Sequence, residues 1–322
     1  MKVLSLFDGI SCGMVALQRA GIPVERYVAY EIDKYAVQVS EKNYPSIEHC
    51  GDVFDGDFTQ YKGFDLLLGG SPCTFWSIAK VRWGREVTPD GMGGKLFMEY
   101  VRALRESGCR YFLYENNYSI HKDIKDFISK QLGVQPITIN SALVSAQVRK
   151  RCYWTNIPNI SQPEDKGILF KDIIEDGLVW KDKAYCVLCS YNGAVIWNTL
   201  KRCQRSMVAI NREYGKYTVE RGEVRIAKVS KPNEVETFKI NLPDGKYDFR
   251  KLTITELERL QTLPEGYTGG GINKSQAIKC IGNGWTVDVI AHILKSIPKL
   301  ENVKGQKPTL IKSLFNLFGV SE

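Results

Sequence analysis

Residues 1–13 of the chain have the sequence MKVLSLFDGISCG, an apolar run that passes directly into a turn with two glycines. The run from Val3 to Phe7 has the length and composition of a buried strand, and the residues after the turn, through Ala20, predict a helix. Where a glycine turn joins a strand to a helix, backbone N–H groups lie close to a bound ligand. This stretch therefore predicts the first strand and helix of an α/β domain, with a binding site where they join.

The same alternation of apolar runs and amphipathic stretches continues through the first half of the chain. It predicts further strands over 27–30, 64–68, 111–114, 137–143 and 151–155, and helices over 33–43, 95–106 and 124–131. Alternating strands and helices form a mostly parallel sheet with helices on both faces. Several polar residues follow the ends of these strands, at the edge where open α/β sheets bind ligands.

The composition changes after Pro158. Residues 161–247 are rich in Lys, Arg, Gly and Asn, include short alternating stretches, and end near the strong turn signal Pro243-Asp244-Gly245. We interpret this region as a small, mostly β insertion. The helical pattern returns from Arg250, and a last amphipathic helix is expected over 287–296. The predicted divisions are therefore 1–160 with 248–300 as the main domain, 161–247 as the insertion, and 301–322 as a tail.

Composition sets only broad limits on function. The chain has 322 residues, 43% hydrophobic and 25% charged, with a formal net charge of +8 that suits a polyanionic partner. Cys186 and Cys189 form a CxxC, but neither a second pair nor a histidine cluster completes a zinc site, so no metal is expected. No apolar run is long enough for a bilayer. We expect a reduced, cytoplasmic protein.

Two carboxylates support a nucleoside cofactor at the first glycine turn. Glu31 ends the second predicted strand, where an acidic residue usually accepts from ribose hydroxyls. Asp52 follows a third apolar segment and can accept from an adenine amino group. A glycine turn alone is also found in plain tight turns, but the three features together favour a cofactor site.

A cysteine follows a proline at the end of another predicted strand, in the segment GGSPCTFWS over 69–77. Most free cysteines are small core residues, but this polar, glycine-flanked loop favours an exposed thiol at Cys73. Such a thiol needs activation to act as a nucleophile at neutral pH. Glu115, at the end of the next strand, can donate a proton to a substrate ring nitrogen. Gln147, Arg149 and Arg151 share one face of an extended segment and either bind phosphate or a carbonyl oxygen, or form a solvated charged face.

These segments occur in an order that resembles the DNA cytosine-5 methyltransferase family, closest to its de novo animal branch. The resemblance covers residues 1–158 and 250–296. It is carried by Phe7-Asp8-Gly9 with Gly13, Glu31, Gly51-Asp52, Ser71-Pro72-Cys73, Glu115-Asn116, Gln147-x-Arg149-x-Arg151, Leu252-Thr253 with Glu256-x-x-Arg259-Leu260-Gln261 and Pro264, and Gly282-Asn283-Gly284. Such a resemblance implies a Rossmann-like class I methyltransferase sheet, with a target-recognition region at 161–247.

The implied activity is methyl transfer from S-adenosylmethionine to C5 of cytosine in double-stranded DNA. Cys73 would add to C6 of a flipped base, Glu115 would hold N3, Arg151 would contact O2, and Arg149 would order the loop that carries Cys73. In the cofactor site, Phe7 would stack on adenine, Glu31 would hold the ribose, Asp52 the adenine edge and Asn283 the methionine end. Further residues expected to bind the cofactor are Asp8, Gly9, Gly13, Ile32 and Val53.

DNA contacts are expected from two basic segments and from the catalytic loops. Residues 79–95, with their glycines and basic residues, would close over the phosphate backbone, although they also fit a plain surface loop. The insertion has basic residues interleaved with tyrosines, of which many are expected to be solvated. The residues predicted to bind DNA are Ser71, Pro72, Lys80, Arg82, Arg85, Gln147, Arg202 and Arg205.

Some positions depart from the family pattern. Asn117 stands where valine is common, Thr74 where bacterial enzymes often have glutamine, and Gly284 where serine is common. None of these departures removes a catalytic group. The alternatives are a catalytically silent DNA-binding paralogue, which the catalytic residues disfavour, and an RNA-methylating enzyme, whose usual Cys-Phe-Thr triplet is missing here.

The tail over 308–318 is apolar for a terminus. It is expected to be a final helix that packs on the domain. An alternative is a short docking segment for a partner, because it resembles the Leu-Phe motifs that bind replication sliding clamps.

Overall fold

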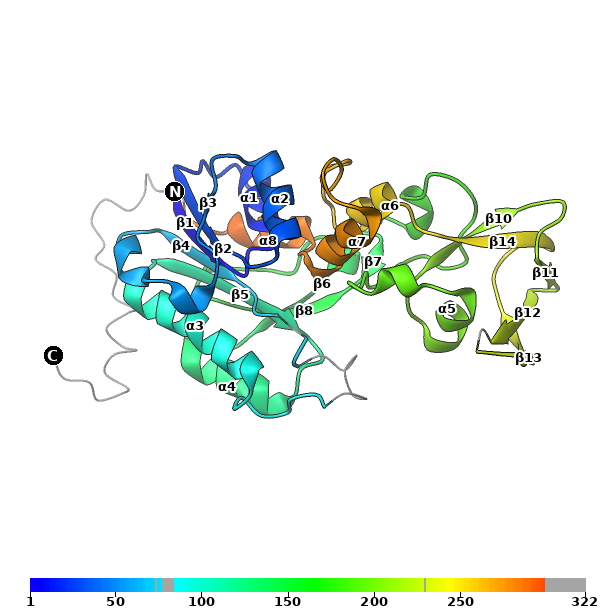
Figure 1. Ribbon diagram of the computed structural model, residues 1–322, viewed down its shortest axis with the longest axis horizontal. Helices are drawn as coiled ribbons and strands as arrows, with labels where there is room; N and C mark the ends of the chain where they lie inside the picture. The colour runs from blue at the N-terminus through cyan, green and yellow to red at the C-terminus, as the bar shows by residue number, and fades with distance from the viewer. Residues whose placement is uncertain (73, 77–83, 229, 299–322) are drawn as a thin grey trace.

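The structure, a computed structural model, describes residues 1–72, 74–76, 84–228 and 230–298. The molecule is elongated, with a large sheet and its helices at one end and a small sheet at the other (Figure 1). Within the described ranges, no helix is both long and apolar enough to cross a membrane. Cys73 and the residues at 77–83, 229 and 299–322 lie outside the description, so the predictions for Cys73, Lys80, Arg82 and the tail fall there.

A seven-stranded sheet forms the large end and has the order β3-β2-β1-β4-β5-β8-β6. Neighbours from β3 to β5 pair in parallel, whereas β8 runs antiparallel to both β5 and β6. This arrangement confirms the predicted, mostly parallel α/β sheet. The strands are β1 (Lys2–Leu6), β2 (Arg26–Tyr30), β3 (Glu48–His49), β4 (Leu66–Gly69), β5 (Tyr111–Asn117), β6 (Ile137–Asn140) and β8 (Lys150–Thr155).

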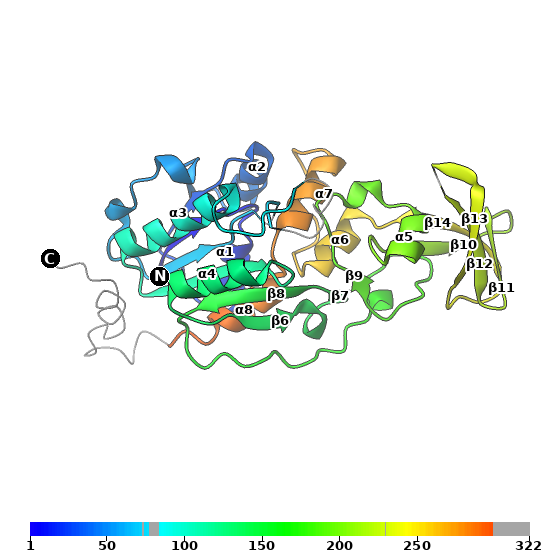
Figure 2. The same ribbon diagram turned by 90° about the horizontal axis from the view of Figure 1, so that it is seen from below.

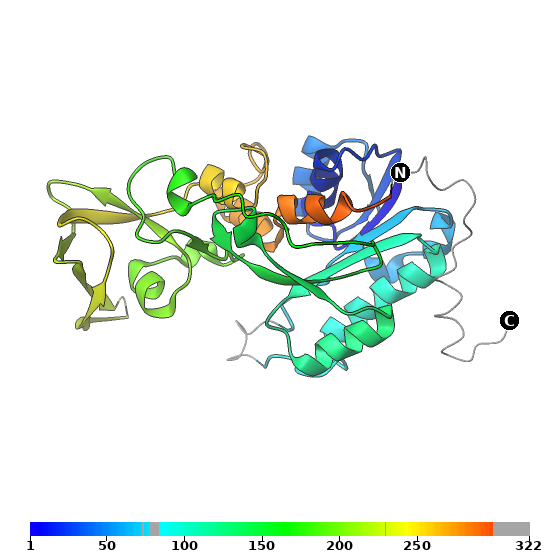
Figure 3. The same ribbon diagram turned by 180° about the vertical axis from the view of Figure 1, so that it is seen from behind.

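Helices cover both faces of this sheet, as predicted (Figures 1 and 3). Alternate residues along a strand point to opposite faces, so Val3 packs in one core and Leu4 in the other. Helices α1 (Cys12–Arg19), α2 (Lys34–Asn43) and α8 (Val287–Leu294) contribute to the core around Val3. Helices α3 (Met92–Ser107) and α4 (Lys122–Leu132) contribute to the core around Leu4.

Short 3₁₀ helices replace parts of the expected strands and loops. The strand predicted over 137–143 is wrong beyond Asn140, because that side chain accepts hydrogen bonds from the backbone N–H groups of Ala142 and Arg149. Asn140 thereby caps η4 and turns the chain out of the sheet. The 3₁₀ helices in the described ranges include η1 (Val53–Asp55), η2 (Phe58–Tyr61), η4 (Ser141–Leu143), η5 (Phe170–Asp172) and η6 (Tyr191–Gly193).

The insertion contains a five-stranded antiparallel sheet, which confirms its predicted β character. Its order is β10-β14-β11-β12-β13, and it lies at the far end of the molecule from the large sheet (Figure 2). The boundary predicted at 247 falls inside β14. The strands are β10 (Met207–Asn211), β11 (Tyr217–Glu220), β12 (Glu223–Lys228), β13 (Lys231–Lys239) and β14 (Gly245–Lys251), and the nearby helix is α5 (Ile196–Arg202).

Two connections join the ends of the molecule. Strand β7 (Gln147–Val148) of the first half pairs in parallel with β9 (Ala184–Tyr185) of the insertion. Helix α6 (Ile254–Leu260) starts directly after β14, and α7 (Lys274–Asn283) packs against it. Thr253 and Glu256 form the capping box expected from the sequence.

The capping glutamate also anchors the small sheet. Glu256 is fully buried, and its carboxylate accepts from Arg250 Nη2 at 2.7 Å and from the Glu175 backbone N–H at 2.8 Å. A buried carboxylate needs such partners to offset its lost hydration. Arg250 belongs to β14, so this ion pair fixes the small sheet against α6.

Candidate active site

Three strands of the large sheet end side by side and carry the predicted active-site residues. Strands β1, β4 and β5 are neighbours, and their carboxyl ends lead to Phe7, Gly70 and Glu115. A Cβ atom on Gly70 would lie 3.0 Å from the Glu115 carbonyl oxygen and 3.2 Å from its carboxylate. Glycine therefore lets the chain before Cys73 pass directly against the glutamate.

Glu115 is held by two donors from distant parts of the sequence. Its Oε1 lies 3.0 Å from Arg151 Nε, and its Oε2 accepts from the indole Nε1 of Trp285 at 3.0 Å. The side chains of Glu115 and Arg151 are only 13% and 14% exposed. Both carboxylate oxygens are thus oriented by fixed partners in a mostly dry environment, where electrostatic interactions are strong.

The register of β5 and β8 explains why the glutamate and arginine meet. Asn117 pairs with Arg151 and Glu115 with Tyr153, so Glu115 and Arg151 are diagonal neighbours on one face. Sequence analysis predicted that both residues act on one base, and the sheet brings them together.

Arg149 is buried, and its guanidinium bonds to residues from two distant segments. Its guanidinium donates to the carbonyl oxygens of Val187 at 2.8 Å, Gly284 at 2.9 Å and Gly282 at 3.3 Å, and to Cys186 Sγ at 3.2 Å. These contacts join the segment that follows β9 to the carboxyl end of α7. The predicted role of Arg149 was to order the loop of Cys73, but its contacts within the described residues are with these two segments.

The loop that leads to Cys73 is anchored on its amino-terminal side. Ser71 is buried, and its hydroxyl lies 2.6 Å from the hydroxyl of Tyr114 on β5. The Asn116 amide donates to both the Ser71 carbonyl oxygen and the Tyr114 hydroxyl, at 3.4 and 3.3 Å. Pro72 is exposed. Ser71 is therefore an internal anchor of this loop, and its contact with DNA stays a prediction.

The first glycine turn has an unusual backbone that a hydrogen-bonded carboxylate supports. Phe7 and Gly9 have φ values of 58° and 60°, in the left-handed region. Asp8, between them, is half-buried, and its carboxylate accepts from the hydroxyls of Ser5, Ser11 and Tyr27. Burial raises the pKa of Asp8 above its ordinary value. Its side chain shapes the turn from inside.

Glycine is needed where α1 begins. A Cβ atom on Gly13 would lie 2.7 Å from Leu68 Cδ1 and 2.8 Å from the Tyr27 hydroxyl. Only a residue without a side chain lets α1 pack this closely on β2 and β4. The amino terminus of α1 thereby comes close to the carboxyl ends of these strands, a position in which helix N–H groups can bind an anionic or polar ligand.

Glu31 closes the other side of this turn. Its Oε2 accepts from the Gly9 N–H at 2.8 Å, while Oε1 accepts from the backbone N–H groups of Ile32 and Asp33. Burial raises the pKa of Glu31. Beside it, the Ile32 side chain is 74% exposed, which is unusual for a large apolar residue. A carboxylate next to an open apolar surface fits a ribose and an adenine ring.

The remaining predicted cofactor residues differ in how accessible their side chains are. Asp52 accepts from the Phe54 N–H at 3.1 Å and starts η1. Val53 has its side chain in the core, whereas Asn283, the last residue of α7, is exposed. Asp52 and Asn283 therefore have accessible polar groups for a nucleoside cofactor, whereas Val53 could contact a cofactor only through its backbone.

The predicted DNA contacts separate into internal and surface residues. Gln147 is fully buried, with its amide bonded to the Leu260 carbonyl oxygen and to Gln261, and its contact with DNA stays a prediction. Arg85 and Arg205 each donate to backbone carbonyl oxygens of neighbouring loops. Arg202 is exposed, with its guanidinium 5.9 Å from the centre of the Trp197 ring.

Comparison with protein families decides the family of the chain. The model of the C-5 cytosine-specific DNA methylase family matches residues 1–299. The chain belongs to this family. A relative that matches along nearly its full length is the type II methyltransferase M.NlaX of Neisseria lactamica, 26% identical over 92% of this chain and 96% of that protein.

Other similar proteins match less of their own length or share less sequence. The orphan methyltransferase M.Rho11sI of Bacillus phage rho11s is 40% identical over 36% of this chain, and the match spans only 23% of the phage protein. The Entamoeba histolytica methyltransferase EhMeth superposes with a TM-score of 0.68 at 14% identity, covering 92% of this chain and 97% of that one. The second likeness shows a shared fold.

Two residues that contact Glu115 or Arg151 were not predicted as site residues. Trp285 bonds to Glu115, although 170 positions separate them. Its only sequence signal is its place directly after Gly282-Asn283-Gly284. Cys186 contacts both Arg149 and Arg151, but the sequence marked it only as half of a CxxC. Among the described residues, no cluster of three His, Cys, Asp or Glu side chains could hold a metal ion.

Proposed function

We propose that the protein transfers a methyl group from S-adenosylmethionine to C5 of a cytosine in double-stranded DNA. The observation that carries this proposal is the Glu115 carboxyl group, held by Arg151 and Trp285 directly against Gly70 on the loop that leads to Cys73. A thiol, a carboxyl group and a guanidinium next to a nucleoside site are the groups that this reaction requires. Names of relatives, which include orphan and type II methyltransferases, favour a role in DNA modification.

The first step is covalent attack on the base. C5 of cytosine is a poor nucleophile, so the reaction is easier in stages. The Cys73 thiolate forms a bond to C6, and the electron pair of the C5–C6 double bond becomes available at C5. Glu115 donates a hydrogen bond or a proton at N3, which accepts the charge that develops in the ring. Arg151 contacts O2 and keeps the carboxyl group aligned.

The second stage restores the ring. S-adenosylmethionine, when bound, supplies an electrophilic methyl group on its sulfonium sulfur. The electron pair at C5 takes this methyl group, which leaves S-adenosylhomocysteine as the product. A base then removes the C5 proton, and the S–C6 bond breaks to release Cys73 as thiolate. Glu115 takes back any proton that it gave to N3 as the aromatic ring returns. Each residue is thus unchanged after one cycle.

The reacting cytosine must leave the DNA stack to reach a thiol at a sheet edge. Unstacking and unpairing cost a few kcal/mol, which contacts with the flipped base and with the remaining duplex offset. Within the catalytic domain, the exposed Pro72 lies beside the proposed base site. In the insertion, the exposed Arg202 can contact phosphate.

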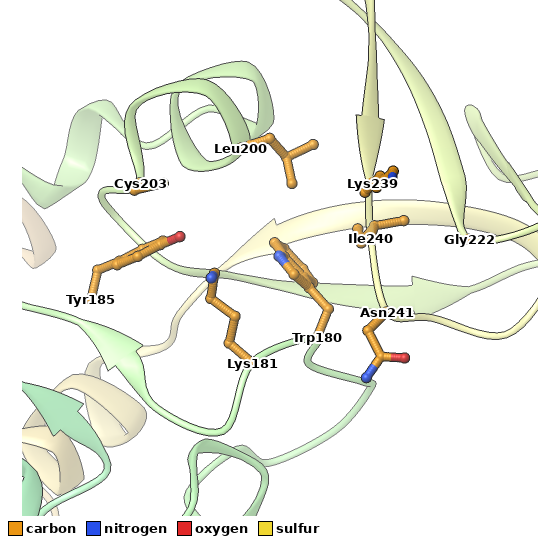
Figure 4. Close-up of a pocket in the computed structure, with 9 residues that line it drawn as sticks. All are labelled: Trp180, Lys181, Tyr185, Leu200, Cys203, Gly222, Lys239, Ile240 and Asn241. Atoms are coloured by element: carbon orange, nitrogen blue, oxygen red, sulfur yellow. The ribbon is translucent and has the colours of Figure 1, made fainter.

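The insertion also offers a cavity whose lining suits DNA. Its volume is about 400 Å³, and its lining includes Trp180, Lys181, Tyr185 and Lys239 (Figure 4). The Lys181 ammonium lies 5.3 Å from the centre of the Tyr185 ring. Aromatic faces stack on bases and ammonium groups attract phosphate. We therefore propose that 161–247 is the target-recognition region and that this cavity lies in the DNA interface.

Methyl transfer with labelled S-adenosylmethionine tests the proposal. The wild-type protein and Cys73→Ala would each be incubated with mixed-sequence duplex DNA, with base-resolution mapping of methylated cytosines, and with RNA of the same sequence. We expect label at C5 of cytosines within a short recurring duplex sequence, and loss of transfer in Cys73→Ala. Transfer to RNA alone, no transfer by the wild type, or equal transfer by the mutant would contradict it.

A further inference from the structure

Arg149 is a buried cation that lacks a carboxylate partner among the residues the structure describes. Arg149 is only 5% exposed. Three of its four contacts are backbone carbonyl oxygens, at Val187, Gly282 and Gly284. The carbonyl groups of Gly282 and Gly284 lie at the carboxyl end of α7, so the helix dipole offsets part of the guanidinium charge, but no carbonyl group carries the full negative charge of an ion. Buried charges are normally paired, because lost hydration otherwise costs several kcal/mol.

The fourth contact is with a group that can carry a negative charge. Cys186 Sγ lies 3.2 Å from Arg149 Nη1 and 3.8 Å from Arg151 Nη2. Burial opposes the charged form of this thiol, yet the charges of Arg149 and Arg151 hold the pKa of Cys186 below its ordinary value. The direction of the shift agrees with the geometry, since two guanidinium groups face one sulfur atom.

Cys186 lies where the insertion meets the catalytic domain. Cys186 directly follows β9, whose partner β7 directly precedes Arg149 and β8. Its neighbour Tyr185 lines the cavity of the insertion, while Cys186 itself contacts the arginines of the catalytic domain. The sulfur therefore lies where the proposed recognition region joins the catalytic residues.

We propose that Cys186 is a positioning residue whose thiolate balances the charge of Arg149 and keeps Arg151 aligned on Glu115. The cluster then holds two cations, Arg149 and Arg151, and two anions, Glu115 and Cys186. If the thiol is neutral, Arg149 remains a buried cation without an anion, and the segments that it joins lose part of their support. Arg151 loses its sulfur contact at the same time. The kinetic part of this inference rests on the proposed methyltransferase activity, while the charge state of Cys186 does not.

Two substitutions separate charge from shape. Cys186→Ser keeps the size of the side chain but is neutral at all accessible pH values, whereas Cys186→Asp restores an anion. We expect Cys186→Ser to lower kcat roughly ten- to a hundredfold, with a smaller change in the KM for DNA, because misplaced catalytic groups affect mainly the chemical step. Cys186→Asp should recover part of this loss. Cys189→Ser, in the same CxxC but exposed, is the matched control and should retain wild-type rates.

The pH dependence distinguishes positioning from a merely structural role. Cys73 is common to wild type and Cys186→Ser, so the ratio of their kcat values isolates Cys186. This ratio should approach one as the pH falls through the pKa of the folded thiol and the wild-type sulfur becomes neutral. A ratio that is constant with pH, or equal losses in Cys186→Ser and Cys186→Asp, would overturn the inference.

A measurement without turnover keeps the two proposals distinguishable. The thiolate absorbs in the ultraviolet, and the difference spectrum between wild type and Cys186→Ser reports its titration. We expect thiolate absorbance to appear at a lower pH than in an ordinary cysteine, whose pKa is about 8.5. A titration at or above this value would overturn the charge assignment even if methyl transfer occurs. If the difference spectrum shows the thiolate but no substrate is methylated, the proposed function fails and the charge assignment stands.

Discussion

The two sheets of this molecule differ in how deeply their strands are buried. In the large sheet, β1 and β4 are apolar and almost completely buried, because helices cover both faces. In the small sheet, β12 alternates exposed and buried residues, and most of β13 is exposed. The comparison indicates that the large sheet fixes a few groups in place, whereas the small sheet presents a polar surface that can differ without loss of the core.

The charged residues follow the same division. In the large domain, Glu31, Glu115 and Arg149 are mostly buried and make several defined contacts each. In the insertion, charged residues such as Arg202 and Lys239 are exposed. Preorganised buried groups suit catalysis, while solvated cations suit contact with phosphate. Substitutions in the two regions should therefore change different quantities.

The largest effect is expected at Glu115. Glu115→Gln keeps the shape but removes the acid that acts at N3, so kcat should fall by roughly 10²–10⁴-fold. DNA binding, measured by fluorescence anisotropy, should change little. Glu41→Gln on the exposed side of α2 is the matched control and should keep full activity. Equal activity of Glu115→Gln and wild type would remove the central role of the glutamate.

The next effect concerns the junction of the two regions. Glu256→Gln leaves Arg250 without its buried carboxylate and should lower the free energy of unfolding by about 2–4 kcal/mol, measured by urea denaturation. Glu236→Gln breaks an exposed ion pair with Lys201 and should cost less than about 1 kcal/mol. Similar losses from both substitutions would show that the buried pair is no stronger an anchor than a surface pair.

Smaller changes are expected from the cations of the insertion. Arg202→Ala and Lys239→Ala should each raise the KM for DNA by roughly three- to tenfold and leave kcat unchanged. For each phosphate contact that is lost, the slope of log Kd against log salt should fall by about one. Lys62→Ala, on an exposed loop of the catalytic domain, should change neither quantity. A drop in kcat without a change in KM would place these residues in catalysis.

The smallest effect is expected at the edge of the large sheet. Arg26 on β2 donates to Glu48 on β3, and this hydrogen bond lowers the pKa of Glu48. Because the pKa is depressed on folding, the pair stabilises the protein above about pH 4.3, and the contribution disappears as the pH falls through the lowered pKa. Both side chains are nearly half exposed, so Arg26→Ala should cost only about 0.5 kcal/mol. A loss that persists at pH 2 would assign the effect to packing.

Sequence patterns predicted the large sheet better than its irregular parts. The strand over 2–6 and the capping box of Thr253 depend on neighbouring residues, so local sequence is enough to find them. The strand over 137–143 failed after Asn140, because one side chain bonded to the backbone ends it. Hydrophobic periodicity contains no information about such a bond.

The site shows the same limit. Glu115 and Arg151 are near strand ends, and the sequence order predicted that they meet. Trp285 and Cys186 reach the site through contacts between distant segments, and no pattern around them specifies those contacts. Gln147 is next to a basic run, and this pattern suggested that its side chain is exposed. In the structure the side chain is buried and bonds to Gln261.

Trapping of the covalent intermediate tests the central claim most directly. In duplex DNA that carries 5-fluorocytosine, the ring has no C5 proton to lose, so the enzyme remains bonded to C6 after methyl transfer. We predict a stable adduct with S-adenosylmethionine whose mass spectrum places the base on Cys73, and its formation should slow sharply in Glu115→Gln. An adduct on Cys186, or methyl transfer to ordinary DNA with no adduct on Cys73, would contradict this account.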